Sequence, residues 1–135
     1  MSKQRIDKLI PEAYQAIEKC NLSNKGKVNK MLCSQISAFG VAVTMGSLLS
    51  AVAFFSTKGR AQRDRQLLMK AIHWLISPQE NRESVTETSL LDMLVKAHNP
   101  NIYRESIIDA AIAIKLAMNL FDLTKNKKDS ETEGA

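Results

Sequence analysis

The chain has 135 residues, of which 44% are hydrophobic and 24% are charged, and its 19 Lys and Arg against 14 Asp and Glu give a net charge of +5. These fractions exclude a wholly disordered chain, and the length indicates one domain with a buried core. Three prolines, five glycines and few aromatic residues favour an all-α protein.

The charge is uneven along the chain. Residues 1–70 carry 12 Lys and Arg with 4 Asp and Glu, whereas residues 71–135 carry 7 and 10. A basic half joined to an acidic half suggests that a polyanion faces one side of the protein, and a solubilising charge distribution is the alternative. Cys20 and Cys33 follow no metal-binding spacing, and the polar start of the chain differs from a signal peptide, so a cytoplasmic protein is expected.

The first predicted helix ends near Cys20. Apolar residues recur at helical spacing before it, at Ile6, Leu9, Ile10, Ala13 and Ile17. Pro11 fits the first turn of a helix or a kink within a longer one, and we favour a main helix from about Pro11, preceded by a helical or frayed basic arm. A polar connection, Asn21 to Gly26, follows.

The stretch from Met31 to Thr57 contains no charged side chain. Such a run is either a membrane span or two adjacent helices buried in a bundle. Its serines, its two glycines and a break at Gly46-Ser47 favour two helices, at about Lys27 to Met45 and Ser47 to Ser56. The second of these is apolar nearly all round, so it is expected to be central and covered. The buried stripe of the first is Val28, Met31, Leu32, Ile36, Phe39 and Val43.

A further helix is predicted from about Arg60 to Ile76. Its apolar face is Leu67, Leu68, Ala71, Ile72 and Leu75. Its polar side carries a row at spacings of three, four and three, namely Arg63, Gln66, Lys70 and His73. Such a row could follow the phosphates of a nucleic acid, and a solvated helix face is the alternative.

Two more helices complete a compact bundle of five to six. Ser84 and Glu87 form a possible capping box for the fifth, with core residues Leu90, Leu91, Leu94 and Val95. The last helix runs from about Asn101 to Thr124, with a stripe at Ile107, Ile108, Ala111, Ile114, Met118 and Phe121. We therefore expect a single helical domain over residues 1–124 and a disordered charged tail over residues 125–135.

The sequence shows no group of residues with a pattern typical of a catalytic site. The two histidines, His73 and His98, fit surface or capping roles, and Asp92 and Asp109 are most simply solvated acids on helices. There is no glycine-rich phosphate loop, no paired metal ligands and no nucleophile elbow. Trp74 fits an anchor of packing better than a base-stacking residue. We expect no enzyme, no cofactor and no metal.

Several motifs resemble one known family. They are Met45-Gly46-Ser47-Leu48-Leu49, Ala53-Phe54-Phe55-Ser56 followed by Lys58, Leu67-Leu68, and Ile72-His73-Trp74-Leu75, with Tyr103-Arg104 nearer the end. This pattern is similar to the small subunit of the type III-B CRISPR effector, the fifth protein of the Cmr module. The chain departs from the family at Met45, where Asn is usual, and at Ile114-Lys115-Leu116-Ala117, where a Trp-Leu-Lys-Arg-like segment is common.

The resemblance implies a non-catalytic subunit of an antiviral ribonucleoprotein. Copies of it would stack beside the backbone subunit and line the groove that receives target RNA, while the crRNA supplies specificity by pairing. The candidate RNA-binding residues are Lys27 and Lys30 on the second helix, Lys58 and Arg60 at the turn, and Arg63 and Lys70 on the fourth helix. Two alternatives are a small single-span membrane protein of the phage lysis type and a helical adaptor that binds only protein.

Overall fold

A computed structural model of the chain describes residues 2–57 and 63–124, with side chains from residue 6 onward. The α-helices are α1 (Ser2–Lys19), α2 (Lys30–Met45), α3 (Leu48–Phe55), α4 (Arg63–Ile76), α5 (Ser89–Lys96) and α6 (Arg104–Met118). Two short 3-10 helices, η2 (Gln79–Ser84) and η3 (Pro100–Tyr103), precede α5 and α6. The predicted all-α fold is confirmed, with the addition of one small three-stranded sheet.

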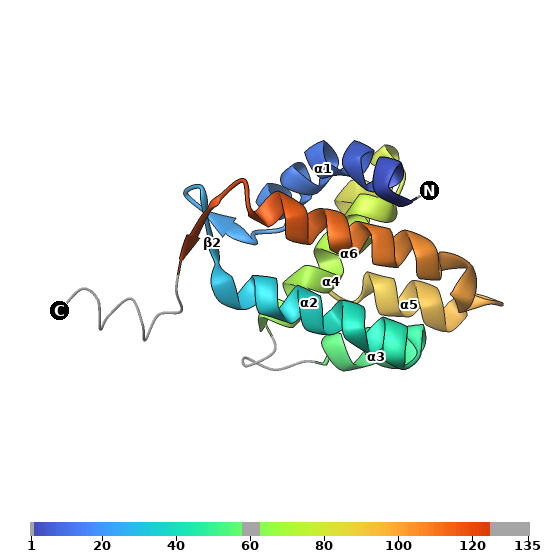
Figure 1. Cartoon of the computed structure of the whole chain (residues 1–135). Helices are drawn as coiled ribbons and strands as arrows, with labels where there is room; N and C mark the ends of the chain where they lie inside the picture. The colour runs from blue at the N-terminus through green and yellow to red at the C-terminus, as the bar shows by residue number, and fades with distance from the viewer. Residues whose placement is uncertain (1, 58–62, 125–135) are drawn as a thin grey trace.

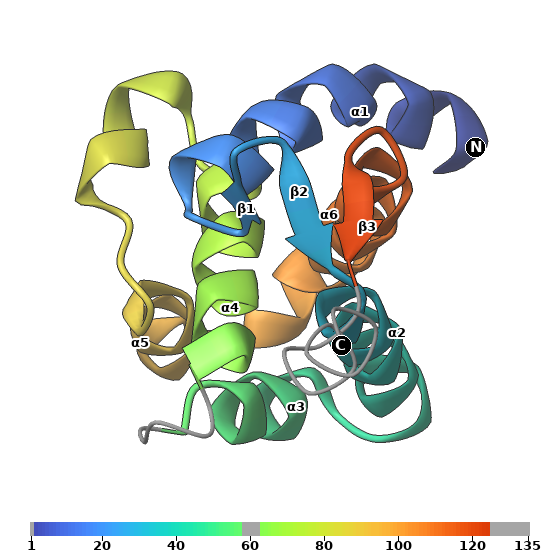
Figure 2. The same cartoon turned by 90° about the vertical axis from the view of Figure 1, so that its left-hand side faces the viewer.

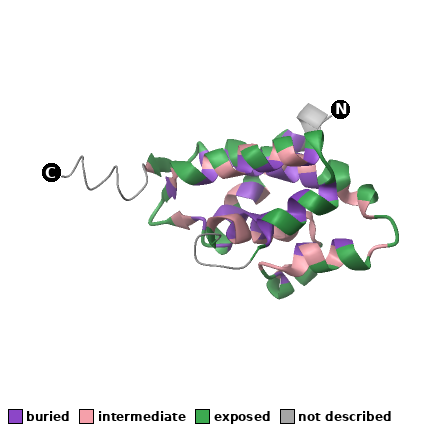
Figure 3. Cartoon of the chain, turned by 90° about the horizontal axis from the view of Figure 1, so that it is seen from below, coloured by how far each residue is buried: buried purple, intermediate pink, exposed green. Residues whose placement is uncertain are grey.

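Helix α6 lies at the centre of the bundle. It packs between α1 and α2, as Figure 1 shows, and it also contacts α4. The stripe predicted for this helix is buried at Ile107, Ala111, Ile114, Met118 and Phe121 and half-buried at Ile108. Seen from below in Figure 3, buried and exposed positions alternate along the helices, as amphipathic sequences require.

Helix α1 begins earlier than predicted. It runs unbroken from Ser2, so Pro11 lies inside it instead of starting the main helix. The proline lacks an N–H and removes one hydrogen bond of the helix, but its ring is exposed to solvent. The burial of Ile6, Ala13 and Ile17 against the core outweighs that loss and holds both halves in one helix.

The sheet replaces two segments for which helix or loop was predicted. Strands β1 (Ser23–Asn24) and β2 (Lys27–Asn29) pair antiparallel, and β3 (Asp122–Thr124) pairs in parallel with β2. The chain turns between β1 and β2 through Lys25 and Gly26, both with positive φ. The second helix therefore starts at Lys30, where Asn29 caps it: the Asn29 Oδ1 accepts from the N–H of Met31 at 2.8 Å.

The uncharged stretch divides as predicted at Gly46-Ser47. The Oγ of Ser47 accepts from the N–H of Ser50 at 3.1 Å and caps α3. The predicted stripe of α2 is buried at Leu32, Ile36, Phe39 and Val43, with Val28 buried in β2, whereas Met31 is exposed. The expectation that α3 is covered all round is wrong, because Leu49 and Phe54 are exposed on it.

The fourth helix confirms its apolar face, which is buried at all five predicted positions. Its start is described from Arg63, and residues 58–62 lie outside the described residues. The capping box predicted at Ser84 is wrong, since Ser84 ends η2 and α5 starts at Ser89. Of the core predicted for α5, Leu90 and Leu94 are buried, whereas Val95 is exposed. The tail predicted over residues 125–135 lies outside the described residues.

Candidate nucleic-acid interface

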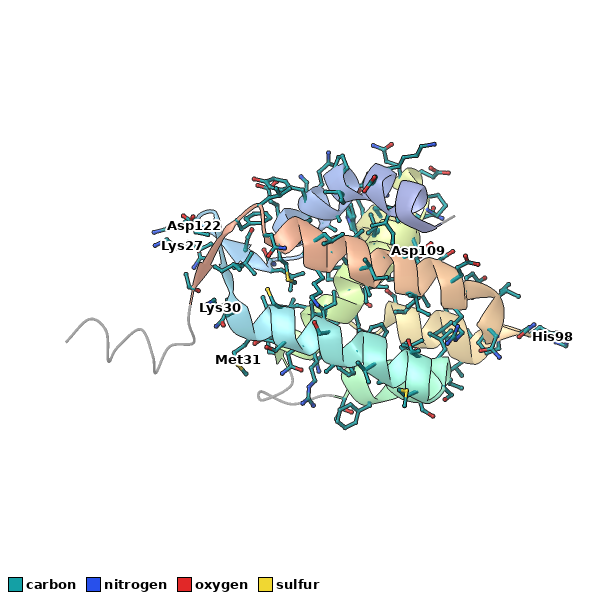
Figure 4. The ribbon with its side chains drawn as sticks, viewed as in Figure 1. Lys27, Lys30, Met31, His98, Asp109 and Asp122 are labelled. Carbon is teal, nitrogen blue, oxygen red and sulfur yellow. The ribbon has the colours of Figure 1, made fainter. Side chains whose placement is uncertain are left out.

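Lys27 and Lys30 lie at one end of the molecule, beside the sheet. Figure 4 labels both there, and Figure 2, which looks onto this end, shows β2 leading into α2. Both side chains are exposed. Lys30 is the first residue of α2, where free N–H groups and the helix dipole already create positive potential. A lysine in that first turn weakens the helix slightly and strengthens attraction for an anion.

Lys27 belongs to a strand and not to the second helix, which corrects the sequence prediction. The side chains of a strand alternate, so buried Val28 points inward while Lys27 and Asn29 point to the other face. Lys27 lies opposite Asp122 in the register of β2 and β3. That carboxylate lowers the positive potential around Lys27, so Lys30 is the stronger anion contact of the two.

Arg63 lies at the same end because α4 starts beside α2. The Nε of Arg65 donates to Oε1 of Gln35 at 3.1 Å and joins the two helices. Asp64 and Lys27 also line one small cavity, of about 330 Å³. Arg63 itself is exposed. The structure thus brings Lys27, Lys30 and Arg63 to one end, while Lys58 and Arg60 lie outside the described residues.

Lys70 lies apart from this group. It is half-buried, and its Nζ is 3.5 Å from Oε1 of Glu87. It lines a different cleft, of about 500 Å³, together with Lys19, Trp74 and Arg82. Its positive charge is therefore balanced within the chain, and the end that carries Lys30 does not include it.

Most side chains of the polar row predicted on α4 interact with other residues of the protein. Gln66 donates through Nε2 to the carbonyl of Thr57 at 2.8 Å, and His73 Nδ1 lies 2.6 Å from Oγ of Ser89. Burial lowers the pKa of His73 below its ordinary 6.5, so its ring is neutral at pH 7 and adds no charge. Of the four residues in the row, Arg63 is exposed and the other three are half-buried.

Phe54 and Arg65 were missed by the sequence analysis. The guanidinium carbon of Arg65 lies 4.9 Å from the ring centroid of Phe54, whose residue is 58% exposed. A signal for Phe54 was present in the spacing of α3, because its buried residues Leu48, Ala51, Val52 and Phe55 form one stripe that omits it. The uniformly apolar composition of the segment hid that stripe.

The prediction that Asp109 is a solvated acid is wrong, because this residue of α6 is buried, with 6% of its surface exposed. Asp92 is exposed, as expected, and His98 is exposed at the end of the molecule far from Lys27 (Figure 4). Across residues 2–57 and 63–124, no three His, Cys, Asp or Glu side chains group closely enough to hold a metal ion.

No family model, curated protein or solved structure matches the chain. The resemblance to the Cmr small subunit accordingly rests on the sequence motifs quoted for it, and its implications are proposals. In the part of the chain that the structure describes, no helix combines the length and the hydropathy needed to cross a bilayer.

Proposed function

We propose that the chain is the non-catalytic small subunit of a type III-B CRISPR effector and that it contacts target RNA through one basic end. The observation that carries this is the gathering of Lys27, Lys30 and Arg63, all exposed, from β2, α2 and α4. The consecutive elements β2 and α2 and the distant helix α4 thus each present an exposed cation at one end, as a surface for a phosphate backbone requires. The sequence motifs shared with the Cmr small subunit support the same function.

In this proposal the basic end positions RNA and reads no sequence. Lysine and arginine contacts to phosphates fix a strand without distinguishing bases, and the crRNA supplies specificity by pairing. The protein acts in the cytoplasm in antiviral defence, in several copies, with the backbone subunit and other Cmr subunits as partners. It needs no cofactor, metal or small-molecule substrate for this role.

The direct test is binding of an unstructured single-stranded RNA by the purified full chain, followed by fluorescence anisotropy. If each copy neutralises three phosphates, log K falls with log salt concentration at a slope of about −2. The triple variant Lys27→Glu, Lys30→Glu, Arg63→Glu is expected to abolish binding with an unchanged helical circular dichroism signal. The matched control, Lys8→Glu with Lys96→Glu and Arg104→Glu, changes three exposed cations elsewhere and is expected to retain most binding.

Lys70→Glu separates the two basic regions. It removes the ion pair with Glu87 but leaves Lys27, Lys30 and Arg63 in place. Affinity for RNA is therefore expected to change little. A loss as large as that of the triple variant would move the interface to the cleft beside Trp74, and unchanged binding in the triple variant would remove the basic end from the proposal.

Partners are tested by a tagged pull-down from the native host after a high-speed spin has removed membranes. Large subunits that co-purify with short guide RNAs would support the effector assignment. Protein confined to the membrane pellet would contradict it and favour the membrane alternative.

The protein-only adaptor is a second candidate, and one observation favours it. A groove of about 460 Å³ between α2 and α6 is lined mainly by apolar side chains, with Ser37, Thr44 and Lys115 among them, and Val41, Met45 and Ile112 are exposed along it. Exposed apolar surface of this kind is typical of contacts with other proteins. The adaptor predicts recovery of protein partners without RNA, and retention of the same partners by the triple charge variant.

A further inference from the structure

Phe54 is an exposed aromatic ring that the packing of α3 does not require. The helix buries Leu48, Ala51, Val52 and Phe55 against the bundle, and this stripe satisfies its apolar face. Phe54 lies outside the stripe and keeps 58% of its surface open to solvent. Its ring meets that of Phe55 edge to face, with centroids 5.8 Å apart at 67°. The ring is thus oriented by its neighbour without being covered by it.

Arg65 adds a fixed cation to this ring. Its guanidinium carbon lies 4.9 Å from the centroid of Phe54 and 5.6 Å from that of Phe55. Its Nε is bonded to Oε1 of Gln35 on α2, so the guanidinium group is oriented from two sides. A planar cation held over an aromatic ring forms a surface on which another flat π system can stack.

This aromatic surface belongs to the same helices as the basic end but to other faces of them. Gln35 is five residues after Lys30 on α2, which is about 7.5 Å along the helix axis and about 140° around it. Arg63 precedes Arg65 by two residues, about 3 Å along α4 and about 160° around it. Among the described residues, the guanidinium group of Arg65 lies over the ring, and the start of α4 adds Arg63 and Asp64. A cation over an exposed ring suits a polyanion with aromatic bases better than an apolar protein surface.

We propose that the ring of Phe54, with the guanidinium group of Arg65 over it, is a stacking site for an unpaired base of single-stranded RNA. The strand that carries this base continues to the basic end, where its phosphates contact Lys30 and Arg63. The site rests on the proposed function and deepens it, because it makes a contact with a base where only phosphate contacts were assigned. Since every base has a π face, the site tolerates any sequence and remains compatible with guide-directed specificity.

The test compares Phe54→Leu and Phe54→Trp in the full chain, with the same unstructured RNA and with a second RNA that carries abasic positions along its centre. Phe54→Leu keeps an apolar side chain but removes the π system, and it is expected to weaken binding of the intact RNA by about 5- to 150-fold. Phe54→Trp restores a stacking surface and is expected to bind at least as tightly as the wild type. The salt slope is expected to stay the same in both, because stacking releases no counterions.

The abasic RNA closes a double-mutant cycle. Replacing intact RNA by abasic RNA is expected to weaken binding to the wild-type protein by about the same factor as the change Phe54→Leu weakens binding to intact RNA. The affinity of Phe54→Leu itself is expected to be nearly the same for the two RNAs. Arg65→Lys keeps the charge without the flat guanidinium group and is expected to give a smaller loss than Phe54→Leu. The fluorescence of the new tryptophan in Phe54→Trp is expected to be quenched by intact RNA and not by abasic RNA.

The outcomes separate this site from the proposed function. RNA binding that depends on Lys27, Lys30 and Arg63 but is equal in Phe54→Leu and wild type would overturn the stacking site alone. Additive losses from Phe54→Leu and the abasic RNA would also overturn it. An absence of RNA binding by wild-type protein would overturn both proposals.

Discussion

The guanidinium carbon of Arg82 lies 4.2 Å from the centroid of the Trp74 ring. From this position Arg82 donates through Nε to the carbonyl of Trp74 at 2.9 Å and through Nη2 to the carbonyl of Leu75 at 3.3 Å. These carbonyls belong to the last turn of α4, where no N–H group of the same helix follows to donate a hydrogen bond to them. Arg82 thus supplies hydrogen-bond donors for two free carbonyls at the end of α4. Its Nη2 also donates to Oε1 of Glu12 on α1 at 2.7 Å.

Arg82→Ala is therefore expected to destabilise the protein by about 2–3 kcal/mol. The change removes the stacking on Trp74 and leaves partly buried carbonyls without a charged donor. Arg82→Lys, which keeps the charge but not the fork of donors, is expected to cost about half as much. Urea unfolding followed by circular dichroism measures both. Arg104→Ala, at an exposed arginine, is the matched control and should stay within about 0.5 kcal/mol of the wild type. Equal stability of all three variants would contradict the role of Arg82.

The second prediction concerns His73 and pH. Burial lowers the pKa of its imidazole below the ordinary 6.5, so the unfolded chain takes up a proton at a higher pH than the folded protein does. The free energy of unfolding is therefore expected to be fully retained above the unfolded pKa, to fall as the pH drops below about 6.5, and to level off below the folded pKa. Urea unfolding at a series of pH values between 5 and 8 measures this.

His73→Asn is expected to remove this component, because the amide group can donate a hydrogen bond to Oγ of Ser89 but does not titrate in this range. His98→Gln changes an exposed histidine and serves as the control, with the pH dependence of the wild type. If the dependence of stability on pH persisted in His73→Asn and disappeared in His98→Gln, the effect would belong to His98 and the prediction for His73 would be wrong.

The third prediction concerns the cysteines. Cys20 is fully buried, and burial raises the pKa of its thiol to about 11, so almost no thiolate is present at pH 8. Burial also raises the pKa of Cys33, but this residue is half-buried, and its Sγ lies 3.6 Å from Sδ of Met118. A thiol reagent is expected to label Cys33 slowly in the native protein and Cys20 only after unfolding. The variant Cys33→Ser should show no labelling until denaturant is added, and rapid native labelling of it would contradict the buried position of Cys20.

The fourth prediction compares two phenylalanines from the uncharged stretch. Phe39 is fully buried and meets Phe55 edge to face with centroids 5.2 Å apart, so Phe39→Ala is expected to cost about 3–5 kcal/mol. Phe54→Ala, at the exposed ring, is expected to lose about 0.5–1 kcal/mol, mainly from the contact with Arg65. Thermal and urea unfolding measure the difference, and equal costs would mean that Phe54 belongs to the core.

The sequence by itself predicted that the protein is helical and where most of its buried helix faces lie, but not where each helix begins and ends. Periodicity located the buried faces of α2, α4 and α6, and Gly46-Ser47 marked the break between α2 and α3. These features depend on residues three and four positions apart, so they can be predicted from the local sequence. The basic composition of the first half is also a property of the sequence, and Lys30 and Arg63 as RNA contacts stay a prediction.

Only the tertiary structure decided what depends on contacts between distant residues. The pairing of β2 with β3 places Lys27 in a strand opposite Asp122, although 95 positions separate these residues. Packing against α6 keeps α1 helical through Pro11. The ion pair of Lys70 with Glu87 and the position of Arg65 over Phe54 likewise need the assembled bundle. Local propensity is small beside the free energy of burying an apolar face, so the assembled core determines which side chains remain exposed for function.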